Sequence, residues 1–224
     1  MGSLLKKRSF GRETSLGVIL VFTVGITGFI NPRFVTGDGT RDLLSATAIV
    51  ALLAIGIAPI MIMRHIDLSI ASTVGLSAWL VADSCAKNPS FTWLQCFLIG
   101  GLVGVCVGVI NGLLVAGLRL PSLVVTLGTL YIVRGGVYVV SNSVDYNAQE
   151  MPPSLLSLGQ KVFFGLLPFP FLLALLLMAT VAWIMKYTKP GRDCYAIGSN
   201  PPAADLVGLK VFRRTFLAYI FSGF

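Results

Sequence analysis

Long apolar runs alternate with short polar segments along almost the whole chain. The runs cover residues 16–30, 43–63, 68–86, 91–118, 122–140, 162–185 and 215–224. A membrane-spanning helix needs about 20 predominantly apolar residues. The first run can extend to Val35, and the third is a weaker span because it is rich in Ser, Thr, Ala and Gly. The pattern predicts an all-α, polytopic transmembrane helix bundle with about six complete spans and the start of a seventh.

The two ends of the chain each carry an ambiguous apolar run. A basic head followed by a short apolar run could be a cleavable signal peptide. The residues that follow this run show no A-x-A cleavage pattern, so we interpret it as a first membrane anchor. The last run, 215–224, would form about 15 Å of helix, half of a bilayer core. Because an unfinished span leaves carbonyl groups in hydrocarbon, we expect the chain to be truncated at its C-terminus.

Composition and charge support a membrane protein. The 224 residues are 55% hydrophobic and 12% charged, whereas a soluble domain has about 25% charged residues. The mean hydropathy is +0.86. The net charge of +8 does not indicate a nucleic-acid partner, because the basic residues flank apolar segments and do not alternate with aromatic ones.

The basic residues also indicate how the chain crosses the membrane. With the N-terminus inside, twelve Lys and Arg residues fall in inner segments and four in outer ones, while Arg134 lies within a span. Lys and Arg accumulate on the cytoplasmic side, so the pattern predicts a cytoplasmic N-terminus in a multi-pass protein of the bacterial inner membrane. The predicted organisation is a basic cytoplasmic segment at 1–14, six spans within 15–185, a cytoplasmic loop at 186–214 and an incomplete seventh span at 215–224.

Residues that support enzymatic or metal chemistry are sparse. Cys85, Cys96, Cys106 and Cys194 form no C-x-x-C pair, and His65 is the only histidine. Free cysteines usually behave as small hydrophobic residues, so we expect four structural cysteines, no metal and no cofactor. The sequence contains no H-E-x-x-H, G-x-S-x-G or G-x-x-x-x-G-K-[ST] motif. This argues against a membrane enzyme and assigns any ATP hydrolysis to a separate subunit.

Glycine recurs at every fourth position in the fourth run. Gly100, Gly104, Gly108 and Gly112 lie on one face of a helix, and Ala116 continues the row. In lipid, such a stripe lets another backbone approach closely. We expect an intramolecular helix contact along it.

Polar residues at membrane depth could line a hydrophilic passage. The candidates are Ser69, Asn111, Thr126, Thr129 and Arg134. A polar group in hydrocarbon needs a partner, so these side chains should face the interior of the bundle. Hydroxyl groups can instead bond to their own helix, which makes Asn111 the most informative. Arg134 either belongs to the pathway or extends its charged group to the outer surface.

Asp67 precedes the third span and has two interpretations. Its carboxylate can cap a helix N-terminus and interact with the positive end of the helix dipole. Alternatively, residues 64–69 are a strained or discontinuous entry to a helix that borders the substrate route. The capping preference of Asp favours the first interpretation.

The predicted cytoplasmic loop contains a short helix. Asn200 is a suitable N-cap and Gly208 a suitable C-terminal stop. Between them, Ala203, Leu206 and Val207 would form a small apolar surface. A two-turn helix is not stable alone in water, so it must dock on the membrane domain or on a partner.

Several stretches occur in the order and at the spacing of a known family. They are residues 66–69, 111–115, 120–129, 134–135, 191–192, 195–200, 203–204 and Gly208. Over about residues 15–224 the chain resembles the permease subunits of bacterial ABC importers for monosaccharides and related compounds, the ribose, rhamnose and autoinducer-2 group. Members of that family are longer and continue into a glycine-rich second half.

The resemblance implies that residues 198–208 are a coupling helix, which inserts into a groove of the ATPase subunit. The coupling residues it implies are Gly198, Asn200, Ala203, Ala204 and Gly208. It also implies an ABC ATPase subunit, a second permease subunit in a homo- or heterodimer, a periplasmic solute-binding protein and a surrounding lipid bilayer.

The expected function is ATP-driven import of a monosaccharide or related small polyol-like solute, of the ribose, rhamnose or autoinducer-2 type, by alternating access. Two alternatives stay open. One is a truncated, non-functional permease fragment. The other is half of a secondary transporter, for which Asp67 is the only carboxylate candidate.

Overall fold

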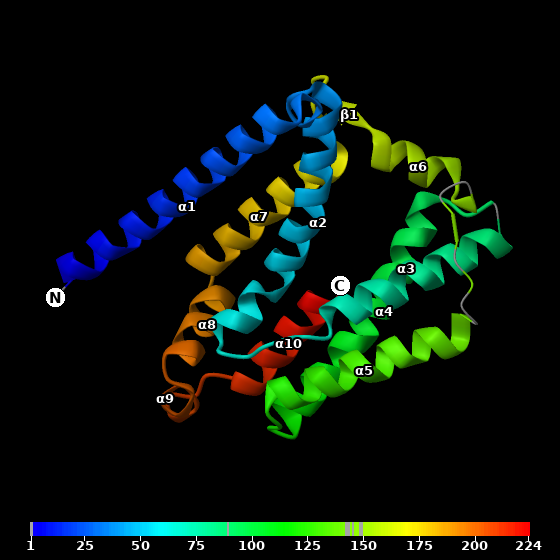
Figure 1. Cartoon of the computed structure of the whole chain (residues 1–224). Coiled ribbons are helices and arrows are strands. Elements are labelled where there is room, and N and C mark those ends of the chain that lie inside the picture. The colour runs from blue at the N-terminus through cyan, green and yellow to red at the C-terminus, as the bar shows by residue number, and fades with distance from the viewer. Residues whose placement is uncertain (1, 89, 142–143, 145, 148–149) are drawn as a thin grey trace.

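The computed structural model describes residues 2–88, 90–141, 144, 146–147 and 150–224, and it is helical over most of that length (Figure 1). The elements are α1 (Gly2–Ile30), the 3-10 turn η1 (Pro32–Val35), α2 (Gly37–Ile62), α3 (Ile70–Lys87), α4 (Trp93–Gly112), the π-helical turn η2 (Leu113–Gly117), α5 (Ser122–Ser141), α6 (Pro153–Gln160), β1 (Val162–Phe163), β2 (Leu167–Pro168), α7 (Phe169–Tyr187), α8 (Lys189–Ser199), α9 (Pro201–Leu206) and α10 (Val211–Gly223).

Among the residues that the structure describes, four helices are long and apolar enough to cross a membrane. They are Gly37–Ile62, Trp93–Gly117, Ser122–Ser141 and Phe169–Tyr187. α3 has 18 residues but carries several small polar ones, and the apolar part of α1, Thr14–Ile30, is shorter. These helices confirm the predicted helical membrane bundle, whereas the count of six spans stays a prediction.

The helix formed by the first apolar run does not continue to Val35. α1 ends at Ile30, and Asn31 adopts an extended conformation and accepts a hydrogen bond from the backbone N–H of Arg33. Proline disfavours a helical conformation in the residue before it, so Pro32 ends the helix at this point. Thr36 then caps α2 by accepting from the N–H of Gly39 at 3.3 Å. The first two helices are therefore separate, and a sharp corner joins them.

The sixth apolar run becomes helical later than expected. Its first residues form an antiparallel hairpin in which Phe163 pairs with Leu167. The turn places Phe164 at φ 52° and Gly165 at φ 71°, which no α-helix accommodates. α7 therefore begins only at Phe169, after the extended residue Pro168. The last helix begins earlier than predicted, because α10 starts at Val211 and not at Thr215.

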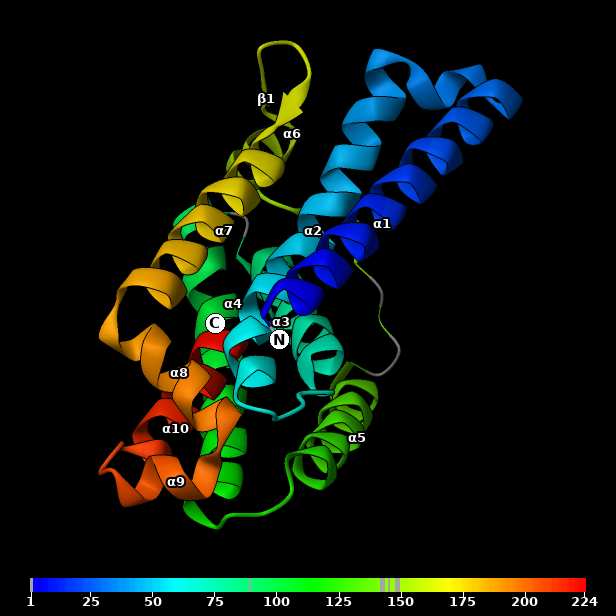
Figure 2. The same ribbon diagram turned by 90° about the vertical axis from the view of Figure 1, so that its left-hand side faces the viewer.

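The helices form two groups that meet at α10. α2 packs along α7, α3 packs against α4 and α5, and α10 lies against both α4 and α2. Figure 1 shows α1 leaning away from the other helices beyond its corner with α2, and in Figure 2, which is viewed from that side, α1 lies in front of α2. The most deeply buried large side chains include Ile60, Met63, Ile197 and Tyr219. The core therefore lies where α2, α8 and α10 converge, close to the short helix α9.

Candidate functional site

The chain between α2 and α3 is a non-helical connection that bonds to side chains of α5 and α10. α2 ends at Ile62, Arg64 has φ 65°, and α3 begins at Ile70. We refer to residues 64–69 as the 64–69 connection. A non-glycine residue with positive φ is uncommon and signals a locally constrained backbone. This supports the interpretation of a discontinuous helix entry.

Side chains from α5 and α10 satisfy the backbone of this connection. The N–H of Ile66 donates to Ser122 Oγ at 3.1 Å. The carbonyl oxygen of Ile66 accepts from Thr126 Oγ1 at 3.3 Å and from the Tyr219 hydroxyl at 3.4 Å. Backbone N–H and C=O groups outside a regular helix need hydrogen-bond partners from elsewhere. Here the partners come from two other helices.

Asp67 holds the chain just before α3. Its Oδ1 accepts from the backbone N–H of Ser69 at 2.9 Å and from Ser69 Oγ at 2.6 Å. Its Oδ2 accepts from Ser222 Oγ at 3.5 Å. Ser69 occupies the N-cap position of α3 and makes no side-chain cap bond of its own. Asp67 therefore organises the helix entry from two residues upstream, which combines features of both interpretations of this carboxylate.

Asn111 joins three helices at the centre of the site. Its Nδ2 donates to Ser69 Oγ at 2.8 Å, and its Oδ1 accepts from Thr129 Oγ1 at 2.6 Å. The side chain is 1% exposed. Since both ends of the amide are used, Asn111 on α4 fixes the entry of α3 relative to α5.

Five of the six candidate pathway residues lie in two hydrogen-bonded groups that meet at the 64–69 connection, and we call the two groups together the central network. One group joins Asp67, Ser69, Asn111, Thr129 and Ser222. The other joins Thr126, Ser122 and Tyr219 to the backbone of Ile66. Beside the first group lies a cavity of about 10 Å³, which is close to the minimum that holds one water molecule. In this conformation Asp67, Ser69 and Asn111 line this small cavity while they bond to one another.

Arg134 is the exception among the candidates. It is exposed on α5 and lines a cavity of about 550 Å³ between α3 and α5, next to Trp79 and Ser141. The structure does not bring it into contact with the central network. Both interpretations of Arg134, an arginine that extends toward the membrane surface and one that belongs to the pathway, stay predictions.

Tyr219 and Ser222 were not among the predicted site residues. Residues 215–224 were interpreted as an unfinished apolar run, although Thr215, Tyr219 and Ser222 recur with helical spacing and therefore share a face. All three are buried. That spacing was a signal that the last helix contributes polar groups to the interior.

The glycine row lies mainly against α10. A Cβ at Gly104 would meet the carbonyl oxygen of Gly223, and one at Gly108 would meet that of Tyr219. A Cβ at Gly112 would lie 2.9 Å from Phe216 Cδ2. Gly100 instead faces α3, where its carbonyl oxygen accepts from Ser77 Oγ at 3.2 Å. Close backbone approach along this seam places Tyr219 next to the 64–69 connection.

α9 follows α8 and is shorter than the predicted segment 198–208. Asn200 Oδ1 accepts from the N–H of Ala203 at 3.2 Å, which caps α9. Gly208 ends the turn with φ 77°, a conformation that favours glycine. Leu206 is 88% exposed and Val207 76% exposed, and Ala203 is exposed beside them. These three residues form the outward apolar face of the α9 corner.

Two expected coupling residues do not face outward. Ala204 is 4% exposed and packs in the protein's own core. Gly198 belongs to α8, and a Cβ there would collide with the carbonyl oxygen of Ile62. Because helical side chains alternate around the axis, Ala204 points inward while Ala203 and Val207 point outward. Gly198 and Ala204 therefore hold α9 against the bundle, and neither is free to contact a partner.

A buried ion pair fastens α8 to α10. Arg214 Nη2 lies 2.6 Å from Asp193 Oδ2, and Arg214 Nε donates to the same oxygen at 2.8 Å. Their side chains are 19% and 12% exposed. Burial raises the pKa of the neighbouring Cys194 thiol, so this cysteine stays protonated at neutral pH.

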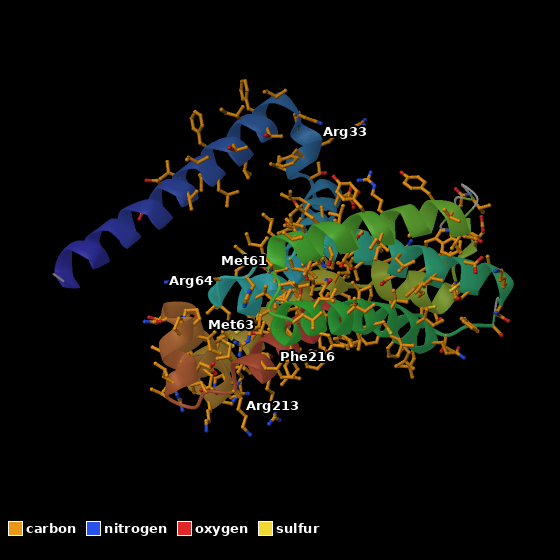
Figure 3. The ribbon with its side chains drawn as sticks, turned by 90° about the horizontal axis from the view of Figure 1, so that it is seen from below. Arg33, Met61, Met63, Arg64, Arg213 and Phe216 are labelled. Carbon is orange, nitrogen blue, oxygen red and sulfur yellow. The ribbon has the colours of Figure 1, made fainter. Side chains whose placement is uncertain are left out.

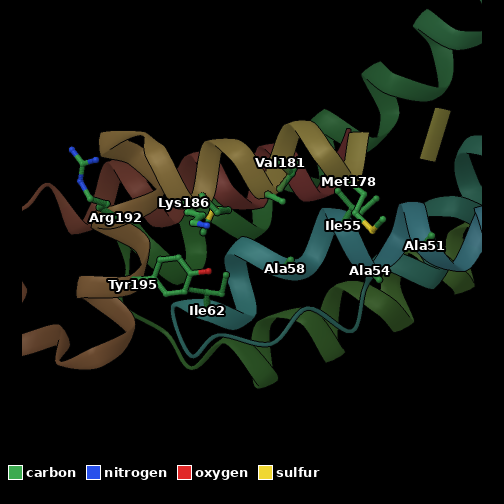
Figure 4. Close-up of a pocket in the computed structure, with 12 residues that line it drawn as sticks. Ala51, Ala54, Ile55, Ala58, Ile62, Met178, Val181, Lys186, Arg192 and Tyr195 are labelled. Atoms are coloured by element: carbon green, nitrogen blue, oxygen red, sulfur yellow. The ribbon is translucent and has the colours of Figure 1, made fainter. Parts of the chain in front are cut away.

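Two larger cavities flank the α8–α10 corner. One of about 910 Å³ lies between α2, α7 and α8 and is lined mostly by Ala, Ile, Val and Met, with Lys186, Arg192 and Tyr195 near one end (Figure 4). Another of about 680 Å³ lies beside α9. Arg64 and Arg213 are among the residues that line it. Figure 3 labels both on the side of the molecule that carries α8 and α10, at a distance from Arg33, which lies at the corner between α1 and α2. The concentration of basic residues around α9 agrees with the side predicted to be cytoplasmic.

The fold defines the chain as a multi-pass helical membrane protein. Within that class it belongs to the family described as branched-chain amino acid transport system / permease component, whose model matches residues 39–224. The autoinducer 2 import system permease protein LsrC of Enterobacter sp. (strain 638) is 35% identical over 100% of this chain and 62% of its own length. The LsrC of Klebsiella pneumoniae subsp. pneumoniae is 34% identical with the same coverage, and that of Photorhabdus luminescens is 30% identical over 98% of this chain and 65% of its own length. The chain thus spans slightly less than two thirds of these relatives. No solved structure matches it.

Replacing Asn111 with Leu tests whether the central network stabilises the helix entry. The variant keeps a similar side-chain volume but removes one partner of Ser69 Oγ, which still donates to Asp67, and one partner of Thr129 Oγ1, which still donates to the Val125 carbonyl oxygen. We expect a loss of about 1–2 kcal/mol in the free energy of unfolding, since two buried hydroxyl groups each lose one hydrogen bond. Thermal unfolding in detergent measures it. An Asn111→Leu protein as stable as wild type would show that the network contributes no net stability.

Proposed function

We propose that the chain is the membrane-spanning permease subunit of an ATP-driven importer for a small hydroxylated solute of the autoinducer-2 or monosaccharide type. Membership in the permease family and the names of the LsrC relatives support this proposal. The proposed partners are an ABC ATPase subunit, a second permease subunit in a homo- or heterodimer and a periplasmic solute-binding protein. The proposed location is the bacterial inner membrane.

The observation that carries the proposal is the outward apolar face of the α9 corner. Leu206 and Val207 are almost fully exposed on a corner whose other side is packed into the core. The corner lies among basic residues on the side proposed to be cytoplasmic. A soluble protein partner, and not lipid, would cover it there. We propose that the ATPase subunit receives Ala203, Leu206 and Val207 in an apolar groove.

A continuous path of contacts would carry movement of α9 to the central network. α9 continues directly from α8, and the ion pair between Asp193 and Arg214 joins α8 to α10. α10 packs along the glycine seam of α4 and bonds the 64–69 connection through Tyr219. In the proposed mechanism, ATP-driven closure of the ATPase subunits displaces α9, and α10 passes that displacement to the connection.

The central network is the proposed closed gate. Ser69, Asn111 and Thr129 bond to one another in this conformation. In the open conformation, the same groups would exchange these bonds for bonds to solute hydroxyl groups. A solute shifts such an equilibrium only if it binds one conformation more tightly than the other, and freed amide and hydroxyl groups supply that difference.

Leu206→Asp is expected to abolish docking of the ATPase subunit without unfolding the permease. The new carboxylate would be buried in an apolar groove on binding but stays in water in the free chain. Truncation of a central apolar contact typically weakens an interface by about 2 kcal/mol or more, or roughly 30-fold in affinity. Co-purification with an ATPase subunit of an autoinducer 2 import system measures the loss.

Ala196→Asp is the matched control. Ala196 is exposed on the neighbouring helix α8, so the same carboxylate should leave co-purification unchanged. Equal ATPase recovery with Leu206→Asp and wild type would contradict the docking assignment. Solute uptake into vesicles that needs a proton gradient but no ATP would instead favour the secondary transporter.

A further inference from the structure

We propose that Cys85 and Cys96 form a structural disulfide bond that ties the end of α3 to the beginning of α4. The two sulfur atoms lie 3.3 Å apart as free thiols in contact. To reach the S–S bond length of about 2.05 Å, they need to approach by only about 1.2 Å. The pair could not be predicted from the sequence, because the two residues lie in different predicted spans.

The helices hold the two cysteines together independently of the thiols. Cys85 lies two residues before α3 ends at Lys87, and Cys96 lies three residues after α4 begins at Trp93. Thr92 and Gln95 form a capping box that fixes the start of α4. Further along the helix pair, Ser77 Oγ donates to the carbonyl oxygen of Gly100. The sulfur atoms therefore meet because α3 and α4 pack in this register.

The location of the pair matches an oxidising compartment. With the proposed cytoplasmic N-terminus, α3 runs outward and the turn between α3 and α4 faces the periplasm. Disulfide bonds form and persist in the bacterial periplasm, whereas cytosolic thiols stay reduced. This inference rests on the orientation in the proposed function, which requires α9 on the opposite side.

The oxidant is a periplasmic protein of the dithiol–disulfide class. The thiolate of one cysteine attacks the oxidant's disulfide to give a mixed disulfide, and the other thiolate then displaces the oxidant as a dithiol. Two protons and two electrons leave the pair, and the oxidant receives them. Cys85 is 1% exposed and Cys96 3% exposed. The exchange therefore takes place before α3 and α4 finish packing, and the finished bond is shielded from reductants.

The other two cysteines provide the internal reference. Cys106 is exposed on the membrane-embedded surface of α4, and Cys194 is buried in α8. Their sulfur atoms have no cysteine partner in the described part of the chain. They should remain free thiols, so the experiment should find two oxidised and two free cysteines.

The experiment labels the full chain expressed in bacteria with an oxidising periplasm. Membranes are quenched with acid and denatured in SDS with N-ethylmaleimide, which blocks every free thiol. After reduction, a maleimide-polyethylene glycol reagent labels the cysteines that had been oxidised. We expect two added polymer groups on wild type and on Cys106→Ser, and none on Cys85→Ser or Cys96→Ser. The intact mass of wild type should rise by about two hydrogen atoms on reduction, because an S–S bond becomes two thiols.

Two further measurements separate the possible failures. A topology reporter inserted at Ser90 tests the orientation directly. Four free thiols in a wild-type chain whose Ser90 is periplasmic would overturn the disulfide proposal and leave the proposed function intact. A cytoplasmic Ser90 would overturn both. A strong reductant present during thermal unfolding should lower the melting temperature of the wild type by about 5–10 °C, because the unfolded chain then loses the bond and its loop regains chain entropy.

Discussion

Replacing Gly108 with Ala is expected to lower the free energy of unfolding by about 3 kcal/mol, because the added methyl group meets backbone and not a movable side chain. The new Cβ would overlap the carbonyl oxygen of Tyr219 and lie 3.0 Å from Ile220 Cα. α10 would have to move by about 1 Å to restore ordinary van der Waals separation. Such a shift would also pull the Tyr219 hydroxyl from the carbonyl oxygen of Ile66, a bond that is already 3.4 Å long.

The same substitution at Gly128 is the matched control. Gly128 lies on α5, and a Cβ there would have no atom within 4 Å. Alanine is a better helix former than glycine by about 0.5–1 kcal/mol, so Gly128→Ala should be neutral or stabilising. Thermal unfolding of both variants in one detergent measures the difference. Similar melting temperatures for Gly108→Ala and Gly128→Ala would rule out a tight seam between α4 and α10.

Local signals in the sequence were sufficient for much of the fold. The apolar runs predicted the long helices because each run must satisfy its backbone within itself in a membrane. Asn200 and Gly208 predicted the ends of the short helix correctly, since a cap and a stop act on residues a few positions away. The start of α7 was wrong because the hairpin at its beginning is as apolar as a helix.

Long-range contacts could not be predicted in the same way. The type and depth of Asn111 indicated that it needs partners, but its contact with Ser69 depends on how α3 packs against α4. The inward direction of Ala204 likewise depends on where α8 places α9. A family resemblance that groups Ala203 with Ala204 cannot distinguish the exposed residue from the buried one.

Replacing Arg214 with Leu is expected to have the largest effect on stability, about 3–5 kcal/mol, because it leaves Asp193 buried without its partner. Asp193 is 12% exposed, and its Oδ2 receives both hydrogen bonds from Arg214. Most of the loss arises from the unpaired carboxylate and not from the attraction of the pair itself. Replacing both residues, with Asp193→Leu and Arg214→Met, should therefore recover most of the lost stability.

Arg213→Leu is the control for the loss of a positive charge at this corner. Arg213 is exposed and has no ion pair within the described residues, so its replacement should change stability by no more than about 0.5 kcal/mol.

The double variant also tests the proposed transmission path, because it keeps the fold but removes the polar link between α8 and α10. Melting temperatures measure the changes in stability, and solute uptake per ATP hydrolysed measures the transmission of movement. A stable double variant with undiminished uptake would show that packing alone transmits the movement of α9, whereas a stable double variant that hydrolyses ATP without uptake would place the Asp193–Arg214 pair on the path.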